Sequence, residues 1–267
     1  LNSNLFNILS MQIEVEKIEK LEKISELCKE IGLGHGGNPY VSGEIQVCDV
    51  LNKINKDKLV IFDVGANKGN YSKMIIEKID RNKDIYLFEP AKSTFKLLEN
   101  NLITQNNTNI YLNNTGFGSK KETKTLFYDK EASGKASVYC RKLDHFNLYF
   151  DKKEKIEINT IDNYCKENGI FRIDLLKLDI EGHEYEALKG AENMFKNDKV
   201  LLCQFEFGGC NIDSRCFFQD FFYFFTQRNM IICRICLDKL VAVQGYNELY
   251  EHFRTTNYLA ISKKLLG

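Results

Sequence analysis

The feature that most constrains the fold is the regular alternation of short apolar runs and amphipathic segments between residues 59 and 206. The run at 59–64 (LVIFDV) is apolar except for one acid, as expected of a strand that is buried on both faces of a sheet. The segments between such runs have the length and apolar spacing of helices. This alternation predicts an α/β fold with a doubly wound, mostly parallel sheet.

The individual elements follow from the same pattern. We expect strands at 59–64, 84–88, 109–113, 173–178, 200–206, 230–237 and 257–262. We expect helices at 44–54, 70–79, 91–102, 161–168, 184–194 and, rich in phenylalanine, 216–225. A strand-rich interval at 122–159 interrupts the alternation. Residues 13–31 also have helical spacing and precede a glycine-rich break, so we expect an N-terminal helical cap over residues 1–58 and the main domain over 59–267.

Composition excludes some classes of protein. Lysine and arginine number 37, and aspartate and glutamate also number 37, so the zero net charge argues against a nucleic-acid partner. No apolar run is long enough to span a bilayer. Nine irregularly spaced cysteines without a secretory signal predict reduced thiols and a cytoplasmic location. Nothing in the sequence indicates an oligomeric state.

Polar residues follow four of the predicted strands, at the point where each strand ends. In doubly wound sheets, ligands bind beyond the carboxyl ends of the strands, where the strand order reverses. We therefore expect these residues to lie along one edge of the sheet and to carry the chemistry. The four segments are 63–69 (DVGANKG), 89–90 (EP), 179–184 (DIEGHE) and 206–209 (EFGG).

The turn at 63–69 differs from a dinucleotide-binding turn. Gly65 and Gly69 are present, but Asn67 stands where the GxGxxG pattern has its second glycine. Asp63 at the mouth of the turn would repel a phosphate and suits a ligand with ammonium and sulfonium groups. Glu89, 20 residues after Gly69, can accept both hydroxyls of a ribose. Each residue alone could serve a turn or a helix cap, but together they predict S-adenosylmethionine as the cofactor.

Five short segments, in this order along the chain, carry a resemblance to a known family. They are 62–71 (FDVGANKGNY), 87–90 (LFEP), 115–118 (TGFG), 160–162 (TID) and 174–184 (DLLKLDIEGHE). The chain resembles the FkbM family of methyltransferases. The resemblance implies a Rossmann-like class I methyltransferase fold and O-methylation of a hydroxyl, often on a sugar or another small molecule.

The resemblance also implies roles for individual residues. It places the turn around the methionine part of the cofactor, Glu89 on the ribose, the loop after the third strand near the adenine, and residues 179–183 beside the transferred methyl group. The chain departs from the family at His183, where alanine is common. The residues assigned to the cofactor are Asp63, Gly65, Ala66, Asn67, Gly69, Tyr71, Glu89, Pro90, Asn114, Thr115 and Asp179.

A hydroxyl acceptor is a weak nucleophile, so a general base is expected. The catalytic candidates are Asp179, Glu181, His183 and Glu206, and our hypothesis is that Asp179 or His183 takes the proton. Asp179, Glu181 and Glu206 are also oxygen ligands of the kind that divalent metals use. Acids at strand ends more often bind hydroxyl groups of a substrate, so we predict no metal.

Two other functions fit parts of the sequence. An RNA 2′-hydroxyl methyltransferase often has a Lys-Asp-Lys-Glu set, which Lys177, Asp179 and Glu206 match in part. The zero net charge favours a small-molecule or glycan acceptor instead. A non-catalytic S-adenosylmethionine-binding partner subunit is the other alternative, and the acids at all four strand ends argue against it.

Overall fold

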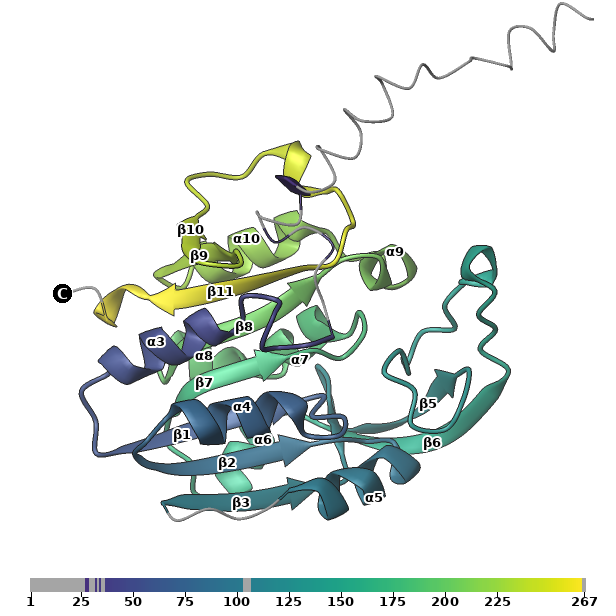
Figure 1. Cartoon of the computed structure of the whole chain (residues 1–267), viewed down its shortest axis with the longest axis horizontal. Coiled ribbons are helices and arrows are strands. Elements are labelled where there is room, and N and C mark those ends of the chain that lie inside the picture. Colours follow the sequence, from purple (N-terminus) through teal and green to yellow (C-terminus); the bar gives the residue numbers. More distant parts are fainter. Residues whose placement is uncertain (1–26, 29–31, 33, 35–36, 103–106, 266–267) are drawn as a thin grey trace, which may run out of the picture.

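The computed structural model describes residues 27–28, 32, 34, 37–102 and 107–265 (Figure 1). A central sheet of eight strands crosses the molecule. Its strands are β1 (Lys58–Val64), β2 (Asn82–Phe88), β3 (Thr108–Asn113), β7 (Ile173–Leu178), β8 (Val200–Phe207), β9 (Met230–Ile235), β10 (Leu240–Ala242) and β11 (Thr256–Ser262). Their order in the sheet is β10-β9-β11-β8-β7-β1-β2-β3.

Five neighbouring strands of this sheet, from β3 to β8, are parallel, and β11, β9 and β10 continue it in antiparallel pairs. The strand order reverses between β1 and β7. Val64 at the end of β1 is in register with Phe88 on one side and Leu178 on the other. The residues that follow these three strands therefore leave the sheet side by side, at the place where such sheets bind ligands. The predicted α/β, doubly wound, mostly parallel fold is confirmed.

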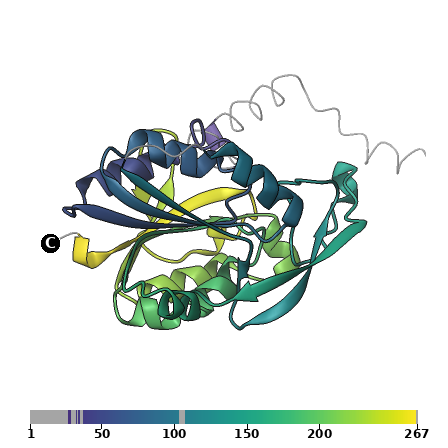
Figure 2. The ribbon, with the colours of Figure 1, turned by 90° about the horizontal axis from the view of Figure 1, so that it is seen from below.

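Helices cover both faces of the sheet (Figure 2). One face carries α3 (Ile45–Lys53), α4 (Asn70–Lys78) and α5 (Lys92–Asn101), and the other carries α6 (Ile161–Glu167), α7 (Glu184–Lys189), α8 (Glu192–Lys196) and α10 (Phe218–Thr226). The short helix α9 (Cys210–Ser214) follows β8. The phenylalanines of α10 are core residues: the ring of Phe221 stacks on that of Phe205 in β8 with a centroid distance of 4.7 Å.

A second, three-stranded sheet projects beside the main one (Figure 1). We call residues 116–159 the arm. It contains β4 (Gly116–Phe117), β5 (Glu122–Tyr128) and β6 (Lys152–Asn159) in the order β4-β6-β5. The strand-rich interval that the sequence predicts is thus confirmed at its two ends. Between them, residues 129–151 form a long loop with one short 3-10 helix, η1 (Asp144–Phe146).

The helix predicted at 184–194 is wrong, because the structure has two helices there, α7 and α8. Gly190 separates them and lies so close to the arm that a Cβ atom would come within 2.1 Å of the Gly118 carbonyl oxygen. Asp162 fixes the break, since its backbone N–H donates to the Gly190 carbonyl (2.9 Å). The Asp162 carboxylate then accepts hydrogen bonds from the backbone N–H groups of Asn193 and the next residue, and so caps α8.

The sequence pattern also missed some short elements, namely α9, β10 and the 3-10 helices η2 (Glu248–Tyr250) and η3 (Lys263–Leu265). The helix predicted at 44–54 is confirmed as α3, whereas most of the one at 13–31 lies outside the described residues. Val47 and Leu51 of α3 pack in the same apolar cluster as Leu59 of β1. The division at residue 58 and the cytoplasmic location stay predictions. Within the described ranges, no helix has the length and apolarity that a membrane span needs.

Candidate active site

The turn after β1 brings the ends of three strands together. Gly65 has a φ of +81°, and a Cβ atom there would lie 1.9 Å from the carbonyl oxygen of Asp179. Only glycine fits this close approach. The backbone N–H groups of Gly65 and Ala66 donate to the Phe88 carbonyl of β2 at 2.9 and 3.0 Å. The turn is thus fixed between the ends of β2 and β7.

Glu89, which follows β2, is positioned by backbone groups. One carboxylate oxygen accepts the N–H of Asn67 at 3.0 Å, and the other accepts the N–H of Ala91 at 2.9 Å. A carboxylate has about four lone-pair positions, so each oxygen keeps one for a ligand. Burial raises the pKa of Glu89 to about 7, although the two N–H groups lower it. The side chain is therefore held in one orientation, with a lone pair on each oxygen left to accept a further hydrogen bond.

Two chambers open on either side of the turn. The arm chamber, about 570 Å³ including its open mouth, lies between Glu89 and the arm. The amino-terminal chamber, about 880 Å³ measured in the same way, is lined by Glu44, Tyr71, Lys177 and Glu206. Both figures count the solvent space at the open mouth together with the enclosed space. The residues that line both chambers are Gly65, Asn67, Gly134, Asp179 and Glu181.

The arm chamber has walls of two kinds. Its arm side is apolar and is formed by Leu126, Val138, Ile156 and Ile158. These side chains belong to the small apolar cluster inside the arm or pack against it. The opposite side carries the Glu89 carboxylate. The chamber suits a ligand with a flat apolar part next to a pair of hydroxyls.

Lys177 is a buried cation between two carboxylates. Its Nζ lies 3.4 Å from Asp63 and 3.2 Å from Asp179, and 4.9 Å from the ring centre of Tyr71. Burial lowers the pKa of Lys177, but the charges of Asp179 and Asp63 raise it more, so the net shift is upward. Asp63 also accepts a hydrogen bond from Ser72 Oγ (2.7 Å) and is fully buried. It lines neither chamber, contrary to the expectation that it faces the ligand.

Asp179 is the most accessible of the four catalytic candidates. Its side chain is 41% exposed and lines both chambers, while Lys177 fixes one of its oxygens. It follows β7, next to the turn, and its backbone N–H donates to the Val64 carbonyl at 3.1 Å. A carboxylate in this position is open to ligands in both chambers.

The loop after Asp179 has an unusual backbone conformation. Glu181 and Gly182 have φ values of +52° and +103°. Glu184 stabilises the loop because one of its carboxylate oxygens accepts the N–H groups of Ile180 (2.8 Å) and Gly182 (3.1 Å). Burial raises the pKa of Glu184 to about 7. Glu184 therefore acts on the shape of the loop and lines neither chamber.

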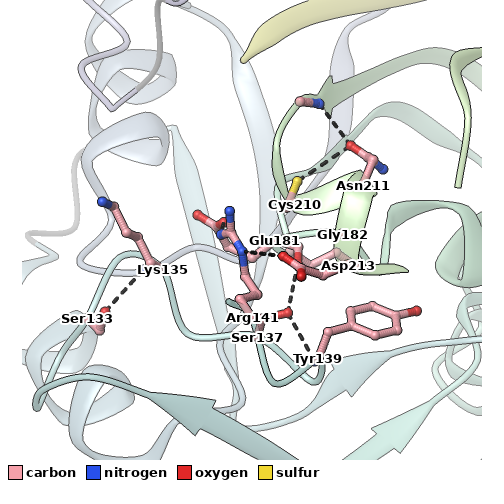
Figure 3. A network of polar contacts seen from close by, with 12 residues as sticks. Ser133, Lys135, Ser137, Tyr139, Arg141, Glu181, Gly182, Cys210, Asn211 and Asp213 are labelled. Atoms are coloured by element: carbon pink, nitrogen blue, oxygen red, sulfur yellow. Dashed lines mark hydrogen bonds and ion pairs between the residues drawn. The ribbon is translucent and has the colours of Figure 1, made fainter. Parts of the chain in front are cut away.

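Three alternate residues of the arm contact this loop, and Figure 3 shows two of them, Ser137 and Arg141, at Glu181. Ser137 Oγ donates to the Glu181 carbonyl oxygen at 2.7 Å. Arg141 forms an ion pair with the Glu181 carboxylate and lies 3.5 Å from Asp213. The Tyr139 hydroxyl is 3.0 Å from His183 Nδ1. The arm thereby fixes the loop that carries Asp179, Glu181 and His183.

The other three catalytic candidates are less free to act. His183 is 4% exposed, its Nε2 is buried and has no hydrogen-bond partner among the described residues, and burial lowers its pKa to about 4. Glu181 is paired with Arg141, and burial raises its pKa to about 8. Glu206 lines the amino-terminal chamber, and burial followed by the charge of Asp179 raises its pKa. This arrangement favours Asp179 over His183 as the base.

The remaining residues assigned to the cofactor are divided between the walls and the frame of the site. Pro90 lines the arm chamber, and Ala66 and Tyr71 line the amino-terminal chamber. Gly69 has a φ of +85° and precedes α4, outside both chambers. The side chains of Asn114 and Thr115 donate hydrogen bonds to the backbone oxygens of Glu89 (2.8 Å) and Glu157 (3.0 Å) and line neither chamber.

The sequence did not indicate that Glu44 and Gln204 are joined beside the amino-terminal chamber. Gln204 in β8 donates to Glu44 and accepts from the Tyr71 hydroxyl, each at 2.6 Å. Nothing in the local sequence indicates this contact, because Glu44 and Gln204 are far apart in the chain. In the part of the chain that the structure describes, no three His, Cys, Asp or Glu side chains are grouped so as to hold a metal ion.

Comparison with known proteins gives a family match. Residues 63–232 match the model of the methyltransferase FkbM domain. The chain is 23% identical over 164 residues to Methyltransferase 1 of Beauveria bassiana (strain ARSEF 2860). This match covers 55% of this chain and 66%, just under two thirds, of the length of that protein. It is 20% identical over 170 residues to the 2-O-methyltransferase NoeI of Sinorhizobium fredii (strain NBRC 101917 / NGR234), with 58% of this chain and 67% of that one covered.

A solved structure was also matched, the Precorrin-6y C5,15-methyltransferase from Geobacter metallireducens GS-15. The match has a TM-score of 0.37 and 12% identity, and covers 81% of this chain and 89% of that one. The assignment of the fold rests on the strand order of the central sheet.

Proposed function

This chain belongs to the FkbM methyltransferase family, and from that premise we propose that it transfers the methyl group of S-adenosylmethionine to a hydroxyl of a sugar, a glycan or another small molecule. The observation that carries the proposal is the pair of carboxylates on either side of the turn. Glu89 is oriented by two backbone N–H groups, and Asp179 is exposed to both chambers. Glu89 suits the ribose of the cofactor, and Asp179 suits the hydroxyl of the acceptor.

The lining of the arm chamber has the character that an adenosine needs. Glu89 would accept the two ribose hydroxyls, and the apolar arm wall with Leu126 and Ile156 would cover the adenine. The backbone of the turn at Gly65 and Asn67 would lie along the methionine part. When bound, S-adenosylmethionine supplies a methyl group on a positively charged sulfur, which is a good leaving group. The protein then has to align the acceptor, and alignment alone can contribute about 7–11 kcal/mol.

Asp179 is proposed as the general base. It is accessible to an acceptor hydroxyl, and Lys177 orients it. Such a base contributes roughly 10²–10⁴-fold to the rate. Glu181 and His183 would act on the position of the loop, because Arg141 and Tyr139 already bind their side chains.

An oxygen acceptor is supported by two observations. The proposed base is a carboxylate, which suits a neutral hydroxyl that hydrogen-bonds to it in the ground state. One relative is named a 2-O-methyltransferase. We therefore expect a neutral sugar or a small alcohol as the acceptor.

The proposal is tested in two steps. Isothermal titration with S-adenosylmethionine and S-adenosylhomocysteine should give binding at a single site. Transfer of a labelled methyl group to a panel of monosaccharides and glycosides should then occur with the wild-type protein and fall by about 10²-fold or more in Asp179→Asn. Binding of neither cofactor form by the wild type would overturn the proposal.

The RNA alternative has one observation in its favour. Lys177, Asp179 and Glu206 line one chamber, as part of a Lys-Asp-Lys-Glu set would. The assay above should therefore include a short RNA. Salt-sensitive RNA binding together with methyl transfer to RNA would favour this alternative over a sugar acceptor.

A further inference from the structure

The carboxylate that the sequence assigns to the ammonium group of the cofactor does not reach either chamber. Asp63 is fully buried below the turn, where Ser72 donates to it and Lys177 pairs with it. Its charge is therefore already matched inside the protein. A ligand with a cationic amino-acid end needs a carboxylate partner elsewhere beside the turn.

Glu44 is a buried carboxylate that lines the amino-terminal chamber. Its two oxygens accept hydrogen bonds from Ser42 Oγ and Gln204 Nε2, both at 2.6 Å, and both donors are neutral. No ion pair reaches Glu44 among the residues that the structure describes, and Lys177 in the same chamber is paired with other carboxylates. Burial raises the pKa of Glu44, and the charge of Lys177 lowers it only in part, so a cation from a ligand would favour the charged carboxylate.

The position of Glu44 is fixed from two sides. Gly43 has a φ of +86°, and a Cβ atom there would lie 2.1 Å from the Cys236 carbonyl oxygen, so the backbone packs tightly against the end of β9. On the other side, Gln204 accepts a hydrogen bond from the Tyr71 hydroxyl at 2.6 Å. Tyr71 lies in the first turn of α4, directly after the glycine turn. Glu44 is thus connected to the helix that begins at the cofactor turn.

Glu206 also lines the amino-terminal chamber and, like Glu44, does not line the arm chamber. It lies at the end of β8, which is separated from β1 by β7. The carboxylates whose charges raise its pKa are, in order, Asp179, Glu181, Glu184 and Glu44, so Glu206 already lies among acids. Glu44 is therefore the better partner for a group beside the turn, and Glu206 serves as a comparison.

We propose that Glu44 binds the ammonium group at the amino-acid end of the cofactor. Glu44 would then be part of the cofactor site, although it lies outside residues 63–232 that match the family. The inference rests on the proposed function, because it takes S-adenosylmethionine as the ligand.

The test uses three ligands and the variant Glu44→Gln. Glutamine can still accept from Gln204 and donate to Ser42, so the variant removes the charge and keeps both hydrogen bonds. Its thermal unfolding midpoint should therefore not fall. Isothermal titration should show S-adenosylmethionine and S-adenosylhomocysteine binding about tenfold or more weakly than to the wild type. The affinity for 5′-methylthioadenosine, which lacks the amino-acid end, should not change.

Glu99→Gln, at an exposed position of α5, is the control and should bind all three ligands as the wild type does. The inference is overturned if the affinity of Glu44→Gln for S-adenosylmethionine is within about twofold of that of the wild type. It is equally overturned if the affinity for 5′-methylthioadenosine falls as much as that for S-adenosylmethionine. It is also overturned if the loss appears in Glu206→Gln instead. A wild-type protein that binds none of the three ligands would contradict the proposed function itself, so the two failures are distinguishable.

Discussion

The carboxylates on the two sides of the turn are held in different ways. Glu89 on the β2 side is positioned by backbone N–H groups of Asn67 and Ala91. Asp179 on the β7 side is positioned by the Lys177 side chain, which in turn depends on Asp63. Backbone donors follow from the fold and persist when side chains change. A network of buried charges depends on each of its members, so the reaction side should be the more sensitive to substitution.

The largest effect is expected from Lys177→Met. It leaves Asp63 buried without its cation, and breaking a buried pair in this way costs about 3–5 kcal/mol. Chemical denaturation measures the loss. The double variant with Asp63→Asn should recover most of the stability but not the rate of methyl transfer. If Lys177→Met is as stable as the wild type, the Lys177–Asp63 pair does not stabilise the β7 side of the site.

The next effect is expected from Glu89→Ala. The substitution removes both carboxylate oxygens that would accept the ribose hydroxyls. We expect it to weaken S-adenosylhomocysteine binding by about 10²-fold. Thermal unfolding without ligand should change less than in Lys177→Met, because Asn67 and Ala91 lose only hydrogen-bond acceptors. Glu99→Ala, at an exposed position of α5, is the control and should bind like the wild type. Equal affinities in both variants would remove Glu89 from the cofactor site.

Binding on the β2 side should also depend on pH. Burial raises the pKa of Glu89 to about 7, so the carboxyl is protonated below that pH and must lose its proton to accept two hydroxyls. The affinity for S-adenosylhomocysteine should therefore fall by about tenfold per pH unit below about pH 7. Titrations at several pH values measure this slope. In Glu89→Gln the number of protons linked to binding should fall by about one, so the affinity should depend less steeply on pH. An unchanged slope would assign the titration to another group.

The smallest effect is expected from Tyr139→Phe. The substitution removes one hydrogen bond to His183 and leaves Glu181 bound to Ser137 and Arg141. We expect a loss of about 1 kcal/mol in unfolding free energy and a modest fall in turnover. Tyr149→Phe, at an exposed position of the arm, is the matched control. A fall in turnover as large as in Asp179→Asn would contradict this and would favour His183, which Tyr139 contacts, as the base.

The same contrast explains what the sequence could predict. The strands and the Gly65 turn follow from local pattern, and Glu89 depends on backbone groups that the turn itself supplies. These were predicted at the positions where the structure has them. The break at Gly190 and the contact between Glu44 and Gln204 were not, because each depends on a neighbour that is distant in sequence. The burial of Asp63 was not predicted for the same reason, since its partner Lys177 lies on another strand.

The central claim is that the turn and the two carboxylates bind S-adenosylmethionine in one orientation. A crystal structure of the complex with S-adenosylhomocysteine tests it most directly. We predict both ribose hydroxyls within hydrogen-bond distance of the Glu89 carboxylate, the adenine against the apolar wall of the arm, and the sulfur facing Asp179. An adenosine bound away from Glu89, or a sulfur that faces away from Asp179, would contradict the account.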